Sequence, residues 1–160
     1  AEITEFVAAA AERIPGRTYL TLHPDPYPGH LAERAGIDVE ALAAHVDEFV
    51  VPLYDTHYAT TYWLETIAKG FESLLAPLSA TFSIELYAVD VDIDNLVRAT
   101  DVAEAYGENV YFGYDAANAA AAIRRKGAAD RPGVTHRPER NDADEGSGPD
   151  GSDGNPERPR

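Results

Sequence analysis

Four apolar segments occur along this chain at intervals of about thirty residues. On either side of each segment, apolar residues are spaced as on one face of a helix. The segments are rich in β-branched and aromatic residues, which favours strands. They span Thr18–His23, Glu48–Tyr54, Thr81–Val89 and Asn109–Tyr114. The helices that we expect around them span Ile3–Arg13, Val39–His45, Thr60–Leu75, Asp94–Tyr106 and Ala116–Lys126. This alternation predicts an α/β fold in which four βα units build a parallel sheet.

The segments after the strands are richer in polar and aromatic residues than those before them. This asymmetry is typical of a binding face at the carboxyl ends of parallel strands. We interpret the four units as half of a (β/α)8 barrel, with an open four-stranded sheet as the alternative. The barrel-like domain is expected over residues 1–128. Residues 129–160 are rich in Pro, Gly, Asp and Arg, and they are predicted to form a disordered tail.

The charge balance limits the possible partners. The chain carries 28 Asp and Glu residues against 13 Lys and Arg residues, a formal net charge of −15. A field of this sign repels nucleic acids and anionic membranes, so we expect neither as a partner. The lysines are Lys69 and Lys126 alone, and such a composition resembles proteins of salt-loving archaea. Without cysteine or an apolar run of membrane-spanning length, the chain is expected to be soluble and cytoplasmic.

Glu85 is the most informative single residue, because it interrupts an otherwise apolar strand segment. The alternation that points Ile84 and Leu86 toward helices would point Glu85 and Tyr87 toward the opposite side of the sheet. A charge in such a place is costly unless it is paired or functional. Two interpretations stay open: an acid of an active site, or a carboxylate tied to an arginine or a backbone amide.

Polar side chains also follow the other predicted strands. Because the carboxyl ends of parallel strands meet at one edge of the sheet, we expect these residues to line a ligand site near Tyr54 and Glu85. The candidate substrate-binding residues are His23, Asp25, Asp55, His57, Tyr114 and Asp115. We expect no cofactor at this site and a small molecule or a carbohydrate as the ligand.

A metal site is the alternative interpretation of the first two strand ends. His23, Asp25, Asp55 and His57 are residue types that ligate Zn²⁺ or Mn²⁺, which would be similar to sugar isomerase-like or hydrolase barrels. The acidic run from Asp90 to Asp94 lacks the Gly and the Glu of a calcium loop. We therefore expect Asp94 to cap the helix that follows it, as Asp38 is expected to do earlier in the chain.

Strand order and residue type together resemble the C-terminal half of a TIM-barrel glycoside hydrolase-like protein, over about residues 1–128. If the four strands correspond to strands five to eight, Glu85 falls where that family carries its nucleophile. Tyr54 then stands where a tyrosine orients the nucleophile, with Tyr87 and Tyr114 beside it. The resemblance implies a carbohydrate ligand and catalytic roles for Glu85, Tyr54 and Tyr87.

Two departures from that family bear on activity. Glycoside hydrolysis needs a second carboxylate, and the family places it on strand four, which this chain lacks. Tyr114 stands where the family more usually has Trp. We therefore expect the chain to be inactive alone, as a fragment whose N-terminal half is missing. The alternative is a non-catalytic half-barrel that associates with a partner, including a second copy in a homodimer, because half a barrel has two unpaired strand edges.

Overall fold

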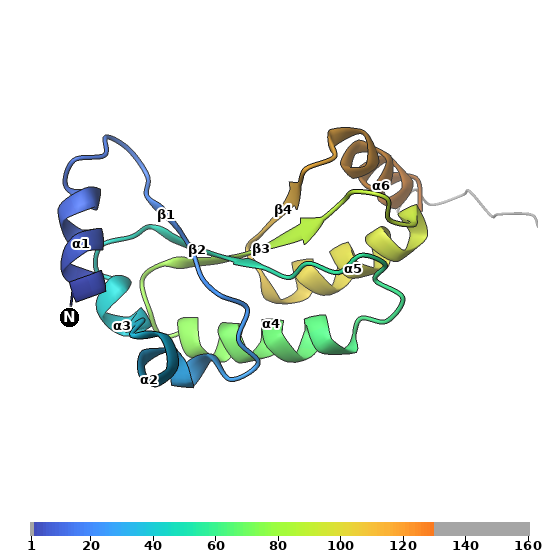
Figure 1. Ribbon diagram of the computed structural model, residues 1–160. Helices are drawn as coiled ribbons and strands as arrows, with labels where there is room; N and C mark the ends of the chain where they lie inside the picture. The colour runs from blue at the N-terminus through green and yellow to red at the C-terminus, as the bar shows by residue number, and fades with distance from the viewer. Residues whose placement is uncertain (1, 130–160) are drawn as a thin grey trace, which may run out of the picture.

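The computed structural model describes residues 2–129, and Figure 1 shows the arrangement of their helices and strands. All four predicted strands form, and they pair in parallel in the order β1-β2-β3-β4. Their bounds are β1 Tyr19–Thr21, β2 Glu48–Pro52, β3 Thr81–Tyr87 and β4 Asn109–Gly113. The α/β prediction is confirmed. Each strand ends one or two residues earlier than predicted, although the amides of Leu22, Leu53 and Ala88 still donate to the neighbouring strand.

Helices connect the strands and flank them on both ends of the described chain. Their bounds are α1 Glu2–Ala11, η1 Pro28–His30 (a 3₁₀ turn), α2 Leu31–Ala35, α3 Val39–Leu42, α4 Tyr62–Leu75, α5 Ile93–Tyr106 and α6 Ala116–Ala129. The sequence did not predict η1 and α2; between the first two strands it predicted only the helix Val39–His45, which forms as the shorter α3. α6 runs one residue past the predicted end of the domain, and the rest of the predicted tail lies outside the described residues. No helix within residues 2–129 is long and apolar enough to cross a membrane.

The predicted helix caps are correct in one case and wrong in the other. Asp38 caps α3, since its carboxylate accepts a hydrogen bond from the Ala41 amide at 3.0 Å. α5 is capped by Asp92, which accepts from the Asn95 amide at 2.9 Å. Asp94 instead lies in the first turn of α5 and pairs with Arg125 of α6 at 3.1 Å. The backbone decides between them, because Asp92 is still extended and Asp94 is already helical.

One side of the sheet is covered by helices and forms the apolar core. α2 to α5 lie below the sheet in Figure 1, and α6 packs against α5 and β4. Between sheet and helices, Phe71 of α4 stacks on Phe82 of β3 with 6.1 Å between the ring centroids. The residues of the strands, and of the positions directly after them, that are buried on this side are Leu22, Phe49, Val51, Leu53, Phe82, Ile84, Leu86 and Ala88. Apolar burial on this side therefore fixes which residues of each strand point to the other side.

The other side of the sheet, which we call the open face, is covered by no helix of the described residues (Figure 1). It is polar and aromatic rather than apolar. Its strand residues are Tyr19, Thr21, Glu48, Val50, Pro52, Thr81, Ser83, Glu85, Tyr87, Asn109, Tyr111 and Gly113. Because strand order follows chain order without a reversal, every right-handed crossover puts its helix on the same side, which leaves the open face bare.

Candidate functional site

Three tyrosines surround Glu85 at the carboxyl end of the open face, and we call Glu85 with Tyr54, Tyr87 and Tyr114 the tyrosine cluster. The ring centroids of Tyr54 and Tyr87 are 5.8 Å apart, those of Tyr54 and Tyr114 are 5.9 Å apart, and those of Tyr87 and Tyr114 are 5.7 Å apart. The residues come from the ends of β2, β3 and β4, which are neighbours in the sheet. The structure thus brings these four residues together at the strand ends, as the sequence predicts.

Gly113 at the end of β4 makes room for the Glu85 carboxylate. A Cβ atom at position 113 would lie 2.9 Å from Oε1 of Glu85 and 3.6 Å from the Tyr54 hydroxyl. Since contacts under 3 Å do not occur with a real Cβ, a side chain there would displace the carboxylate. Glu85 therefore leans across the sheet toward β4 and lies beside the Tyr54 hydroxyl.

The tyrosine cluster is an acceptor-rich site with no neutralising cation among residues 2–129. No Lys, Arg or His of that part forms an ion pair with Glu85. Burial raises the pKa of Tyr54, and the neighbouring Tyr114 hydroxyl and Glu85 carboxylate raise it further. Tyr54 is therefore a neutral donor at physiological pH. Such a site offers a carboxylate, hydroxyl groups and aromatic faces to a ligand that enters from the open side.

Tyr58 holds the strands apart directly below this cluster. Its hydroxyl donates to the Leu53 carbonyl at 3.0 Å and accepts from the Tyr87 amide at 2.7 Å. In an uninterrupted parallel ladder, the next bond after Leu53 N to Glu85 O would join the Tyr87 amide directly to the Leu53 carbonyl. The hydroxyl stands between those two groups, so β2 and β3 separate at the point where Tyr54 and Tyr87 begin.

Asp55 secures the loop that carries Tyr58. Its Oδ1 accepts from the amides of His57 at 2.7 Å and Tyr58 at 3.2 Å, and its Oδ2 accepts from the Trp63 indole at 3.0 Å. Burial acts to raise the pKa of Asp55, but these hydrogen bonds outweigh it and leave the pKa below its ordinary value. They also hold Tyr58 at a φ of 46°, a conformation that a bulky residue rarely adopts. Asp55 thus builds the loop, and His57 is exposed beside it.

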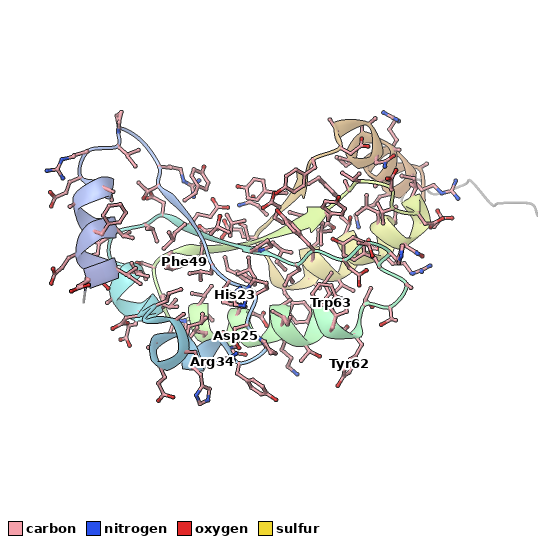
Figure 2. All side chains as sticks on the ribbon, in the orientation of Figure 1. His23, Asp25, Arg34, Phe49, Tyr62 and Trp63 are labelled. Atoms are coloured by element: carbon pink, nitrogen blue, oxygen red, sulfur yellow. The ribbon has the colours of Figure 1, made fainter. Side chains whose placement is uncertain are left out.

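The four residues of the metal alternative are not brought together. Asp25 is only 2 % exposed, and its carboxylate binds Arg34 at 2.8 Å and the Tyr27 amide at 2.7 Å. Figure 2 shows Asp25 beside Arg34 and His23, while Trp63, the partner of Asp55, lies apart from them on α4. Within residues 2–129, no three His, Asp or Glu side chains are grouped as a metal site. These residues therefore do not fit a Zn²⁺ or Mn²⁺ ion.

Asp115, the last residue predicted to bind substrate, directly precedes α6. Its carboxylate accepts from the amides of Ala117 at 2.9 Å and Asn118 at 3.0 Å. The Asn118 side chain then donates to the Ala88 carbonyl at 2.9 Å, which ties α6 to the end of β3. These bonds fix the neighbouring Tyr114 at a φ of 75°, with its side chain largely in solvent. Asp115 therefore positions Tyr114.

Glu48 is a buried carboxylate that the sequence reading missed. It is 1 % exposed at the amino end of the open face, where it accepts from the Tyr111 hydroxyl at 2.8 Å and faces Arg17 at 3.4 Å. Asn109 donates to Ser83 at 3.2 Å in the same network. In the sequence Glu48 follows an acidic neighbour at a strand start, which favours an exposed position. The sequence indicates the position of Glu48 only through the alternation of side chains along β2, which places Glu48 on the open face.

Glu48 and Glu85 cannot act as a pair. Glu85 is opposite Pro52 in the register of β2 and β3, four residues along β2 from Glu48. At about 3.3 Å per residue, the two are separated by roughly 13 Å along the strands. The two carboxyl groups of a glycosidase are about 5 to 9.5 Å apart. Glu48 is therefore part of a structural network at the amino end, and Glu85 lies at the opposite end of the open face.

Comparison with known proteins adds no assignment: no family model, curated protein or solved structure matches the chain.

Proposed function

We propose that this chain is the C-terminal half of a (β/α)8 barrel that binds and processes a carbohydrate at the carboxyl ends of its strands. The strand order and the single helix layer support the barrel, since successive βα units of a barrel have this arrangement. A doubly wound sheet would need a reversal of strand order and helices on both sides. The open face then corresponds to the barrel interior.

The observation that carries the ligand class is the tyrosine cluster. A Glu85 carboxylate without a cationic partner among residues 2–129 can accept hydrogen bonds from sugar hydroxyls. The tyrosine rings offer apolar faces with polar edges, which suit a ring that is apolar on one side and hydroxylated at its rim. Metal-dependent chemistry receives no such support, because the four candidate ligands are not grouped and the Asp25 and Asp55 carboxylates bind neighbouring donors of the chain.

In this proposal Glu85 is the nucleophile or the carboxylate that stabilises a developing positive charge. The neutral Tyr54 hydroxyl orients it, while Tyr87 and Tyr114 form the walls of the site. Hydrolysis needs a second carboxylate, and the nearest candidate on the open face, Glu48, is too distant. The described residues therefore supply one half of the chemistry, and the acid that protonates the leaving group has to come from outside them.

The test measures the binding of methyl glycosides of common hexoses and pentoses to the chain by saturation-transfer NMR. We expect at least one to bind, and Glu85→Gln to weaken its binding about tenfold or more, the loss of a charged hydrogen bond. The unfolding free energy should change by less than about 1 kcal/mol, because Glu85 is not part of the apolar core. Glu65→Gln, on the exposed side of α4, is the matched control. The proposal fails if no glycoside binds up to 50 mM (roughly 2 kcal/mol at the 1 M standard state), or if Glu85→Gln binds as well as the parent.

A further inference from the structure

Glu85 supplies the negative charge of the tyrosine cluster. Tyr54 is a neutral donor, because burial and the neighbouring Tyr114 and Glu85 side chains raise its pKa. Within residues 2–129, Glu85 forms no ion pair with a Lys, Arg or His side chain. The Glu85 side chain is half-buried, so water solvates its charge only in part. The cluster therefore holds one negative charge that a ligand can neutralise.

The three aromatic rings of the cluster are inclined to one another and do not stack. The angles between their planes are 48° for Tyr54 and Tyr87, 54° for Tyr87 and Tyr114, and 78° for Tyr54 and Tyr114. Their centroids form a triangle with sides of 5.7 to 5.9 Å. A group above the middle of this triangle can lie within about 6 Å of all three centroids, the range in which aromatic rings attract a cation.

The surrounding backbone holds these rings in place without a ligand. The Tyr58 hydroxyl keeps β2 and β3 apart at the point where Tyr54 and Tyr87 begin. The hydrogen bonds of Asp115 hold Tyr114 at a φ of 75°. A residue other than glycine keeps such a conformation only where its surroundings enforce it. The arrangement of the rings therefore exists before binding, which lowers the entropic cost of binding a ligand there.

We propose that the ligand of the tyrosine cluster carries an ammonium group, which lies over the three rings and donates hydrogen bonds to Glu85. The sugar part of this inference rests on the function proposed above, and the two together name an amino sugar with a free amine. A charged hydrogen bond to the carboxylate and the attraction of the ring faces both favour an ammonium group over a hydroxyl group. The net charge of −15 favours cationic ligands over anionic ones.

The test compares the methyl glycosides of glucosamine and N-acetylglucosamine, which share the sugar ring and differ in the charge on one nitrogen. NMR titrations at about pH 6 keep the amine charged. About 0.15 M KCl screens the attraction of distant carboxylates. We expect the charged glycoside to bind about tenfold more tightly than the neutral one.

Variants assign this preference to the cluster. Glu85→Gln should abolish it, because the ammonium group then has no carboxylate to bind. Tyr114→Leu removes one ring face and should lower the preference about threefold, whereas Tyr114→Phe keeps the ring face and should retain it. Tyr114 is 75 % exposed, so neither change disturbs the core. Glu65→Gln removes a carboxylate on the exposed side of α4 and is the control for net charge; it should leave the preference unchanged.

Methylammonium chloride, a cation without a sugar, separates this inference from the carbohydrate assignment. We expect it to shift the resonances of Tyr54, Tyr87 and Tyr114 in the parent and not in Glu85→Gln. Equal binding of the two glycosides would overturn the ammonium site and leave the carbohydrate assignment intact. Shifts caused by methylammonium in a chain that binds no glycoside would refute the carbohydrate assignment and leave the ammonium site intact. A chain that binds neither kind of probe would refute both.

Discussion

Replacing Tyr58 by Phe tests the unusual junction between β2 and β3. The change removes one oxygen, and with it the hydrogen bonds to the Leu53 carbonyl at 3.0 Å and the Tyr87 amide at 2.7 Å. Tyr58 is completely buried, so water cannot replace the hydroxyl without a rearrangement. A buried backbone group without a partner costs about 1–3 kcal/mol. Two such groups set an upper limit of about 6 kcal/mol.

Partial closure of the gap would restore a direct bond between the Tyr87 amide and the Leu53 carbonyl, so the net loss should be about 2–3 kcal/mol. Urea unfolding followed by circular dichroism measures it, and hydrogen exchange should show faster exchange of the Tyr87 amide. Tyr62→Phe is the matched control, because the Tyr62 side chain is 77 % exposed, and it should change stability by less than about 0.5 kcal/mol. A loss below 0.5 kcal/mol for Tyr58→Phe, with the Tyr87 amide still protected, would refute the bridging role.

Two further changes test the loop and the cluster. Because the pKa of Asp55 is lower in the folded chain than in the unfolded chain, its hydrogen bonds contribute fully above about pH 4, and the contribution is lost as pH falls through the folded pKa. When the pH is lowered from 5 to 3, the unfolding free energy of Asp55→Asn should therefore fall less than that of the parent. Urea titrations that show the same fall for both proteins would contradict this. Gly113→Ala places a methyl group 2.9 Å from Glu85 Oε1. Because the Glu85 side chain can move, stability should fall by only about 1 kcal/mol while glycoside binding falls about tenfold; unchanged binding in the NMR titration would show that Glu85 is not held there.

Local patterns in the sequence were sufficient to predict the four strands. Apolar runs such as Phe49 to Leu53 need burial on one side at least, and the spacing between runs predicts crossover helices. The short helix α2 was missed because five residues carry too little periodicity, and its end depends on Gly36 at a φ of 68°. The prediction that Asp94 caps α5 was wrong because the segment from Asp90 to Asp94 contains several aspartates. The backbone conformation, which the sequence does not show, makes Asp92 the cap.

The tyrosine cluster could be predicted in outline, because the carboxyl ends of parallel strands share an edge. The roles of Asp25, Asp55 and Asp115 could not, since a carboxylate after a strand serves equally as a ligand or as an acceptor for loop amides. Their partners are donors in the loops and helices that follow them, which the sequence does not reveal as donors. Glu48 was missed because its burial depends on Tyr111, whose position is set only when β4 joins the sheet.

Strand order also has a consequence for how the chain reaches this structure. Each strand pairs with the next one in sequence, so every pairing closes a loop of about thirty residues and has a similar entropic cost. The pairings can therefore form one after another. The hydrogen bonds of Glu48 to Asn109 and Tyr111 are different, because they join residues 61 and 63 positions apart and pass over β3. They can form only after both neighbouring pairings exist, so they are among the last contacts to form and connect β2 to β4 once the sheet is complete.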